Sequence, residues 1–134
     1  METMQIEVDT TNRRVTDLTG DLRAFCRGKG DGLLSVFVPH ATAGLAILEL
    51  GAGSERDLDE LLDRLLPRDD RYLHAHGSPG HGADHLLPAL VGPSLTVPVL
   101  EGEPALGVWQ SVALVDTNPD NPKRRVRLSF LDAV

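Results

Sequence analysis

Short strand-like runs bounded by glycine and proline constrain the fold of this chain more than any other sequence feature. They lie at residues 5–8, 33–38, 44–50, 94–100, 105–115 and 124–131. Runs of this length, rich in β-branched and apolar residues, are typical of strands in globular proteins. None approaches the roughly 20 apolar residues that a helix needs to cross a bilayer. The chain is therefore predicted to form about six strands and no membrane span.

Three other stretches predict helices, because their apolar residues recur at three- and four-residue steps. They lie at residues 15–26, 54–66 and 84–91. In the second, Ser54 and Asp57 resemble a capping box, and the leucines are expected in the core. Asp84 is expected to cap the third helix, with Pro88 near its first turn. Helices mixed irregularly with strands indicate an α+β fold with a mostly antiparallel sheet or sandwich.

Length and charge limit the broad class of the protein. At 134 residues the chain predicts a single domain spanning residues 1–134. Its formal net charge of −7 argues against nucleic acid as a main partner, because duplex binding needs a basic surface. The N-terminal residues lack the basic start and apolar core of a signal peptide, and Cys26 has no second cysteine to pair with. We expect a cytoplasmic protein.

The histidines carry the strongest chemical signal. All five lie between residues 40 and 85, and four of them fall within residues 74–85 among glycines. Neutral imidazole is the commonest protein ligand for zinc and titrates near neutral pH. The pattern predicts a metal site or an acid–base site, against the alternative of scattered histidines in a solvated loop.

Spacing alone leaves the choice of ligands open. His74 and His76 face the same side only if the segment is extended, because strand side chains alternate. His81 and His85 share a face only on a helix, and the glycines at 80 and 82 argue against a helix through His81. The sequence therefore predicts three nearby imidazoles without choosing which three.

Polar residues in apolar surroundings are the other candidates for chemistry. Glu49 interrupts the predicted strand at residues 44–50, where an unpaired buried charge is costly, so it is exposed, paired or functional. Asp116 ends a predicted strand, and an acid facing water is the simpler interpretation there. Arg125 and Arg127 would share one face of the last strand, either as solvated charges or as a clamp for an anion.

Several segments together resemble the YjbQ-like family, which also carries the label secondary thiamine-phosphate synthase. The similar segments follow one another in order from about residue 30 to 130. They are Pro39-His-Ala-Thr-Ala-Gly-Leu45, Glu49, Tyr72-Leu-His74, His85, Gly92-Pro-Ser94 and Leu106-Gly-Val-Trp-Gln110. The chain departs from the family pattern at Leu48, Leu50, Ala75 and Val108, and His76 and His81 stand where other residues are common.

The resemblance implies a β-sandwich core, a homotrimer with sites close to subunit contacts, and a bound divalent metal, with zinc favoured. It places His40, His74 and His85 at the metal. Glu49, Trp109 and Gln110 match further motif positions, and we expect them to be catalytic. We expect Thr42, Ser94, Arg124 and Arg125 to bind the ligand, the arginines because the basic residues at 123–127 are the local supply of positive charge.

Two functions compete on this basis. The first is a metal-dependent enzyme acting on a small phosphorylated or heterocyclic substrate, with thiamine-phosphate synthase-like or hydrolytic activity. There the metal acts as a Lewis acid or activates a water, Glu49 serves as base, and Arg124 or Arg125 holds phosphate. The second is a non-catalytic trimer that binds a metal or a small ligand. A scaffold protein with an acidic surface ranks third.

Overall fold

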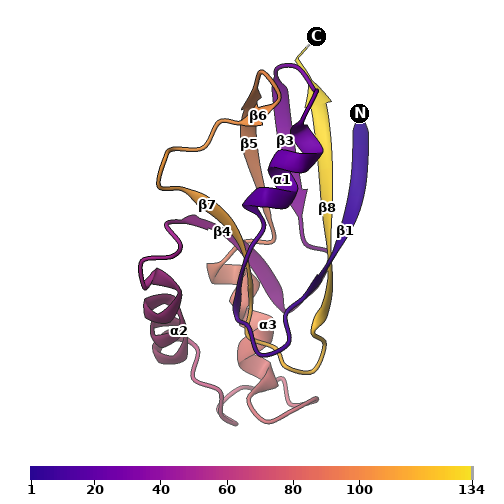
Figure 1. Cartoon of the computed structure of the whole chain (residues 1–134). Coiled ribbons are helices and arrows are strands. Elements are labelled where there is room, and N and C mark those ends of the chain that lie inside the picture. Colours follow the sequence, from indigo (N-terminus) through magenta and orange to yellow (C-terminus); the bar gives the residue numbers. More distant parts are fainter. Residues whose placement is uncertain (134) are drawn as a thin grey trace.

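Eight strands form two antiparallel sheets in the computed structural model, which describes residues 1–133. The larger sheet has the order β1-β8-β3-β5-β6 and the smaller sheet the order β2-β7-β4. The first comprises β1 (Glu2–Asp9), β8 (Lys123–Asp132), β3 (Gly32–Phe37), β5 (Ser94–Leu100) and β6 (Glu103–Pro104); the second comprises β2 (Val15–Asp17), β7 (Ser111–Asp116) and β4 (Ala43–Leu48). With three helices, this arrangement confirms the predicted α+β class with antiparallel sheets (Figure 1).

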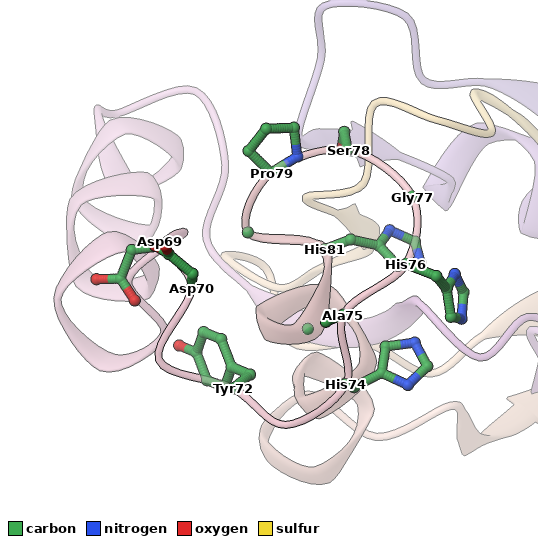
Figure 2. A pocket seen from close by; sticks show the side chains of 12 residues that line it. Asp69, Asp70, Tyr72, His74, Ala75, His76, Gly77, Ser78, Pro79 and His81 are labelled. Atoms are coloured by element: carbon green, nitrogen blue, oxygen red, sulfur yellow. The ribbon is translucent and has the colours of Figure 1, made fainter.

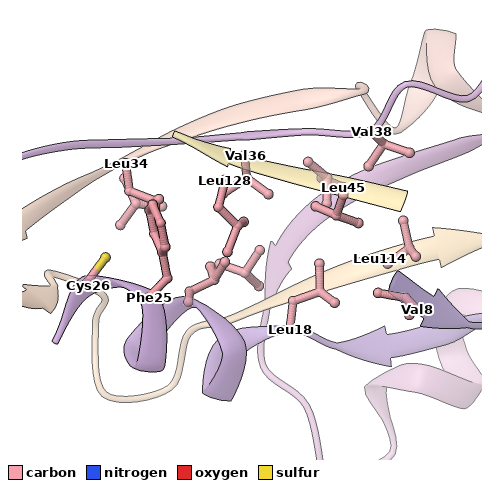
Figure 3. Close-up of a cluster of buried hydrophobic side chains, with 14 of the residues drawn as sticks. Val8, Leu18, Phe25, Cys26, Leu34, Val36, Val38, Leu45, Leu114 and Leu128 are labelled. Atoms are coloured by element: carbon pink, nitrogen blue, oxygen red, sulfur yellow. The ribbon is translucent and has the colours of Figure 1, made fainter. Parts of the chain in front are cut away.

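The main core lies between the two sheets. Strand side chains alternate between faces, and β8 accordingly buries every second residue from Arg124 to Phe130. Leu34 and Val36 of β3 meet Leu45 and Leu114 of the smaller sheet in one buried cluster (Figure 3). Helix α1 (Thr19–Cys26) covers this cluster with Leu22, Phe25 and Cys26.

The other two helices position the histidine segment. Helices α2 (Ser54–Leu65) and α3 (His81–Leu90) lie at the opposite end of the molecule from α1 (Figure 1). A second buried cluster joins them to the smaller sheet through Leu62, Leu87 and Val115. The loop at residues 66–80, which carries His74 and His76, therefore connects two helices docked on the same sheet. No helix among residues 1–133 is long and apolar enough to span a membrane.

Two predicted elements are partly wrong. The helix expected at residues 15–26 begins only at Thr19, because residues 15–17 pair with β7 as strand β2. The strand expected at residues 105–115 begins only at Ser111. Before it, a turn is closed by the Gln110 N–H donating to the Gly107 carbonyl at 3.0 Å, and the Gln110 side chain accepts the Gly107 N–H at 2.8 Å.

The expectations for helix α2 and its preceding strand also need correction. Gly53, in the left-handed region at φ 97°, occupies the cap position, and no side chain caps the helix. Of the leucines expected in the core, Leu62 is buried whereas Leu61 and Leu65 are largely exposed. Strand β4 ends at Leu48, so Glu49 follows the strand rather than interrupting it.

The start of α3 was also predicted wrongly. The helix begins at His81, with Gly80 at φ 81° as its cap, so Asp84 lies in the first turn instead of capping it. Pro88 lies well inside the helix. The glycines that argued against a helix through His81 instead allow the tight turn in which it begins, because glycine adopts positive φ without strain.

Candidate metal centre

Four imidazoles converge at the start of α3. Each of His74, His76, His81 and His85 offers one ring nitrogen, and these nitrogens all lie within 4.8 Å of one another. The closest ring centroids, His74 to His76 and His74 to His85, are 4.1 Å apart. Figure 2 shows the rings of His74, His76 and His81 gathered on one side of the loop. A pocket of about 220 Å³ adjoins them.

The helix supplies the rigid half of this cluster. His81 and His85 are four residues apart on α3 and therefore lie one turn apart on the same face. Their Nε2 atoms are 2.9 Å apart, so one of the two nitrogens carries the proton between them. His81 is 7% exposed and is the most buried ring of the four.

The loop supplies the other half, held against the helix by close backbone approach. A Cβ at Gly82 would lie 2.6 Å from Tyr72 Cβ and 2.7 Å from the His74 carbonyl oxygen. The Tyr72 hydroxyl donates to the Pro67 carbonyl at 2.7 Å, which fixes the start of the segment. His74 and His76 are themselves exposed, so the loop brings them to the helix from the solvent side.

Carboxylates lie behind His81 on the side away from the cluster. Its Nδ1 lies 3.2 Å from an Asp120 carboxylate oxygen and 3.7 Å from an oxygen of Asp84. Asp84 is fully buried and accepts hydrogen bonds from Arg68 and from the Thr117 hydroxyl. The Ser78 N–H donates to Asp120 at 2.9 Å and lowers the pKa of that carboxyl, so it is ionised at neutral pH.

Two of the clustered histidines have lowered pKa values. Desolvation is the first cause for both His74 and His85, and the positive charges that neighbouring imidazoles would carry add to it. Neutral imidazole is the form that binds metal. Desolvation and the neighbouring imidazoles therefore both favour the metal-binding form of these two rings at neutral pH.

A pH dependence of stability follows for the metal-free protein. Since the folded pKa values of His74 and His85 lie below the ordinary value of 6.5, the unfolded chain binds more protons as pH falls. Above pH 6.5 both rings are neutral in the folded and unfolded chain, so the folded state carries no cost of burying their charge. That cost appears as pH falls from 6.5 through the folded pKa values, and the protein becomes less stable. We expect the urea midpoint in EDTA to decrease from pH 7.5 to 5, and to decrease less for His85→Gln. A midpoint that rises on acidification would contradict this expectation.

The donor set fits a borderline divalent metal. Zinc bound to four imidazoles at about 2.0–2.1 Å in a tetrahedron requires ligand nitrogens roughly 3.3 Å apart. The separations between the ring nitrogens, from 2.9 Å for the helix pair to at most 4.8 Å, bracket that value.

His40, which the resemblance placed at the metal, is not a member of this cluster. It follows β3, and its Nε2 accepts the Arg125 backbone N–H at 2.9 Å. Desolvation, with Arg124 and Arg125 nearby, lowers its pKa. The structure therefore brings together two of the three predicted metal ligands, His74 and His85, and places His40 beside β8.

Two of the predicted ligand-binding residues lie in a buried polar network. Arg124 is 2% exposed and donates two hydrogen bonds to Asp116, at 2.7 and 2.9 Å, and a third to the Thr42 hydroxyl. Thr10 and Asn118 also bond to Asp116. Asp116 is thus buried and paired, contrary to the expectation that it faces water, and Arg124 has its hydrogen bonds directed inward.

The remaining predicted site residues are exposed and scattered. Ser94 begins β5, and Arg125 lies on the outer face of β8. Trp109 is 72% exposed in the turn before β7, beside Gln110, whose amide oxygen binds that turn. Glu49 is exposed after β4. Within one chain these side chains do not surround the four histidines.

The sequence carried a signal for the complete histidine set, but neighbouring residues contradicted it. The four-residue step from His81 to His85 is the helical signal, and the flanking glycines obscured it. Asp120 gave no sign of a role, because it reaches His81 from a loop about 40 residues further along the chain. The signal that could have indicated the helix start is the glycine directly before His81, because glycine is an accepted residue at a helix N-cap.

Comparison with known proteins decides the family. A family model described as UPF0047 protein YjbQ-like matches residues 4–133. The chain belongs to the YjbQ/UPF0047 family. A UPF0047 protein of Mycobacterium tuberculosis is 66% identical over 132 residues, covering 98% of this chain and 99% of the relative. One from Archaeoglobus fulgidus is 33% identical over 123 residues, covering 91% of this chain and 94% of that relative.

Solved structures of YjbQ-like proteins share the fold. A hypothetical protein from Aeropyrum pernix superposes with a TM-score of 0.87 at 33% identity, covering 98% of this chain and 99% of the other. A conserved YjbQ/UPF0047 protein from Clostridium acetobutylicum gives a TM-score of 0.84 at 27% identity, over 96% and 99% of the two chains. The family resemblance read from the sequence is therefore confirmed.

Proposed function

We propose that this YjbQ-family protein binds a divalent transition metal, with zinc the best fit, through His74, His76, His81 and His85. The observation that carries the proposal is the gathering of four ring nitrogens within 4.8 Å. Imidazole suits zinc, copper and nickel, whereas magnesium and calcium prefer oxygen ligands. His74 and His85 keep their predicted roles, and His76 and His81 replace His40.

The ligand count bears on what the metal does. Four imidazoles complete a tetrahedral zinc shell, whereas catalytic zinc sites keep a position for water or substrate. A closed shell favours binding without turnover, which is the second of the two functions predicted from the sequence. His74 and His76 are both exposed on the loop, so the departure of either one would open a position for Lewis-acid chemistry.

Exchange of single histidines tests the ligand set. We expect wild-type protein, incubated with zinc and desalted, to retain about one zinc ion per chain. His81→Ala should lose most of that zinc. His40→Ala, which also removes one histidine but from outside the cluster, should keep it. Retention by His81→Ala together with loss in His40→Ala would restore the ligand set inferred from the resemblance and reject ours.

A phosphorylated small molecule is the second candidate ligand. A hollow of about 420 Å³ is lined by Lys123, Arg124 and Arg125, with Glu7 and Asp9 opposite. Arg125 and Lys123 are exposed, which leaves Arg125 rather than the paired Arg124 as the phosphate-binding residue. Calorimetry with inorganic pyrophosphate checks this: binding weakened by Arg125→Ala supports the phosphate site that a thiamine-phosphate synthase-like activity would need, and no binding argues against that activity.

A homotrimer is also proposed, since an exposed apolar turn supports a subunit contact. Val108 is 88% exposed and Trp109 is 72% exposed. A neighbouring copy would bury both and could bring Trp109, Gln110 or Glu49 of one subunit to the site of another. Light scattering after gel filtration reads the subunit number, and a monomer at micromolar concentration would reject the trimer.

A further inference from the structure

The most buried ligand of the metal centre has a carboxylate behind it that has no role in the ligand set. His81 Nδ1 is buried, and the carboxylate nearest to it is that of Asp120, which comes from the loop between β7 and β8. The two atoms are 3.2 Å apart, which is within ion-pair range, but the contact does not have hydrogen-bond geometry, so His81 Nδ1 has no hydrogen-bond partner. Asp84 adds negative charge on the same side of the ring at 3.7 Å.

Asp120 is itself held from two directions. Its backbone N–H donates to the Asn118 side chain at 2.9 Å, and its carboxylate accepts the Ser78 N–H at 2.9 Å. Asn118 in turn donates to the Thr42 hydroxyl at 3.1 Å. The acid is thus fixed to the histidine loop on one side and to the buried network of Arg124 on the other.

The two carboxylates determine which nitrogen of the His81 ring carries the proton. A neutral imidazole has one N–H and one lone pair. Two carboxylates face Nδ1, so the N–H belongs there. Nε2 then carries the lone pair and accepts a hydrogen bond from the His85 Nε2–H at 2.9 Å in the metal-free protein. The same lone pair faces the centre of the four-histidine cluster.

We propose that Asp120 is a positioning residue of the metal centre, holding His81 as its Nδ1–H tautomer so that Nε2 is the metal ligand. The consequence for affinity rests on the proposed metal-binding function, whereas the tautomer itself does not. A carboxylate hydrogen-bonded to the second nitrogen of a ligating histidine fixes the ring orientation and raises its basicity. Loss of such a partner typically weakens metal binding by about 10- to 100-fold.

Asp120→Asn separates this role from a structural one. The asparagine amide keeps an oxygen that can accept the Ser78 N–H, so the loop anchor remains while the charge is lost. Asp70→Asn is the matched control, because it removes the same charge from an exposed residue of the 66–80 loop. Two measurements are made on all three proteins: long-range ¹H–¹⁵N spectra of His81 without metal, and zinc affinity by competition with a chelator.

In the wild type and in Asp70→Asn, we expect His81 to give the Nδ1–H pattern. In Asp120→Asn that preference should be lost, with zinc affinity about 10- to 100-fold lower. An unchanged tautomer in Asp120→Asn overturns the inference whatever the zinc result. Absence of zinc binding in the wild type rejects the proposed function, and the tautomer spectra then decide the role of Asp120 on their own.

Discussion

Replacing Asp116 by alanine is expected to lower the free energy of unfolding by about 3–5 kcal/mol, the cost of breaking a buried ion pair. The reason is the charge left behind. The Asp116 side chain is fully buried and that of Arg124 is 1% exposed, so the guanidinium would have no carboxylate and little water. Urea denaturation at neutral pH measures the change.

An exposed ion pair provides the control for this experiment. Arg14 and Asp63 lie 2.7 Å apart, but the side chain of Asp63 is 57% exposed. Asp63→Ala should therefore cost only about 0–1 kcal/mol. If Asp116→Ala does not fold, Asp116→Asn keeps the shape and should still be clearly less stable than wild type. A loss at Asp116 no larger than that at Asp63 would contradict a structural role for the network.

Gly82→Ala is expected to separate the two halves of the histidine cluster. An added Cβ would meet Tyr72 Cβ at 2.6 Å and the His74 carbonyl at 2.7 Å, both too close for real atoms, so the loop must move away from α3. Metal sites need their ligands held within about 0.5 Å. We therefore predict zinc affinity lower by about tenfold or more, measured by chelator competition.

A second glycine substitution separates local displacement from a general effect. A Cβ at Gly20, inside α1, meets nothing within 4 Å. Gly20→Ala should leave zinc affinity unchanged and stabilise the helix by about 0.5–1 kcal/mol. Circular dichroism should show both variants folded. Equal zinc affinity in Gly82→Ala and wild type would mean that the loop does not depend on its contact with α3.

The fold was largely predictable because its main elements have clear periodicity. The alternation in β8 and the leucine spacing in α2 correctly indicated a strand and a helix. The errors came where hydrogen bonds, rather than the spacing of apolar residues, decided the structure. Residues 15–17 are strand because β7 offers them an edge, and the turn before Ser111 is set by its own hydrogen bonds.

The candidate site was predictable as a region but not as a ligand set. The density of histidines indicated the segment, and His74 and His85 lie in the cluster. Gly80 concealed the helical pair, because glycine disfavours a helix interior. In the structure Gly80 instead adopts the left-handed conformation and begins the helix. His40 lies with β8, and Asp120 reaches His81 only through the folded chain.

X-ray absorption at the zinc edge of the zinc-loaded wild-type protein tests the central claim most directly, because it counts imidazole ligands. We predict a shell of nitrogen atoms at about 2.0 Å, with outer-shell scattering from about four imidazole rings. A zinc ion bound mainly by oxygen with two or fewer imidazoles, or no retained zinc, would contradict the four-histidine metal centre.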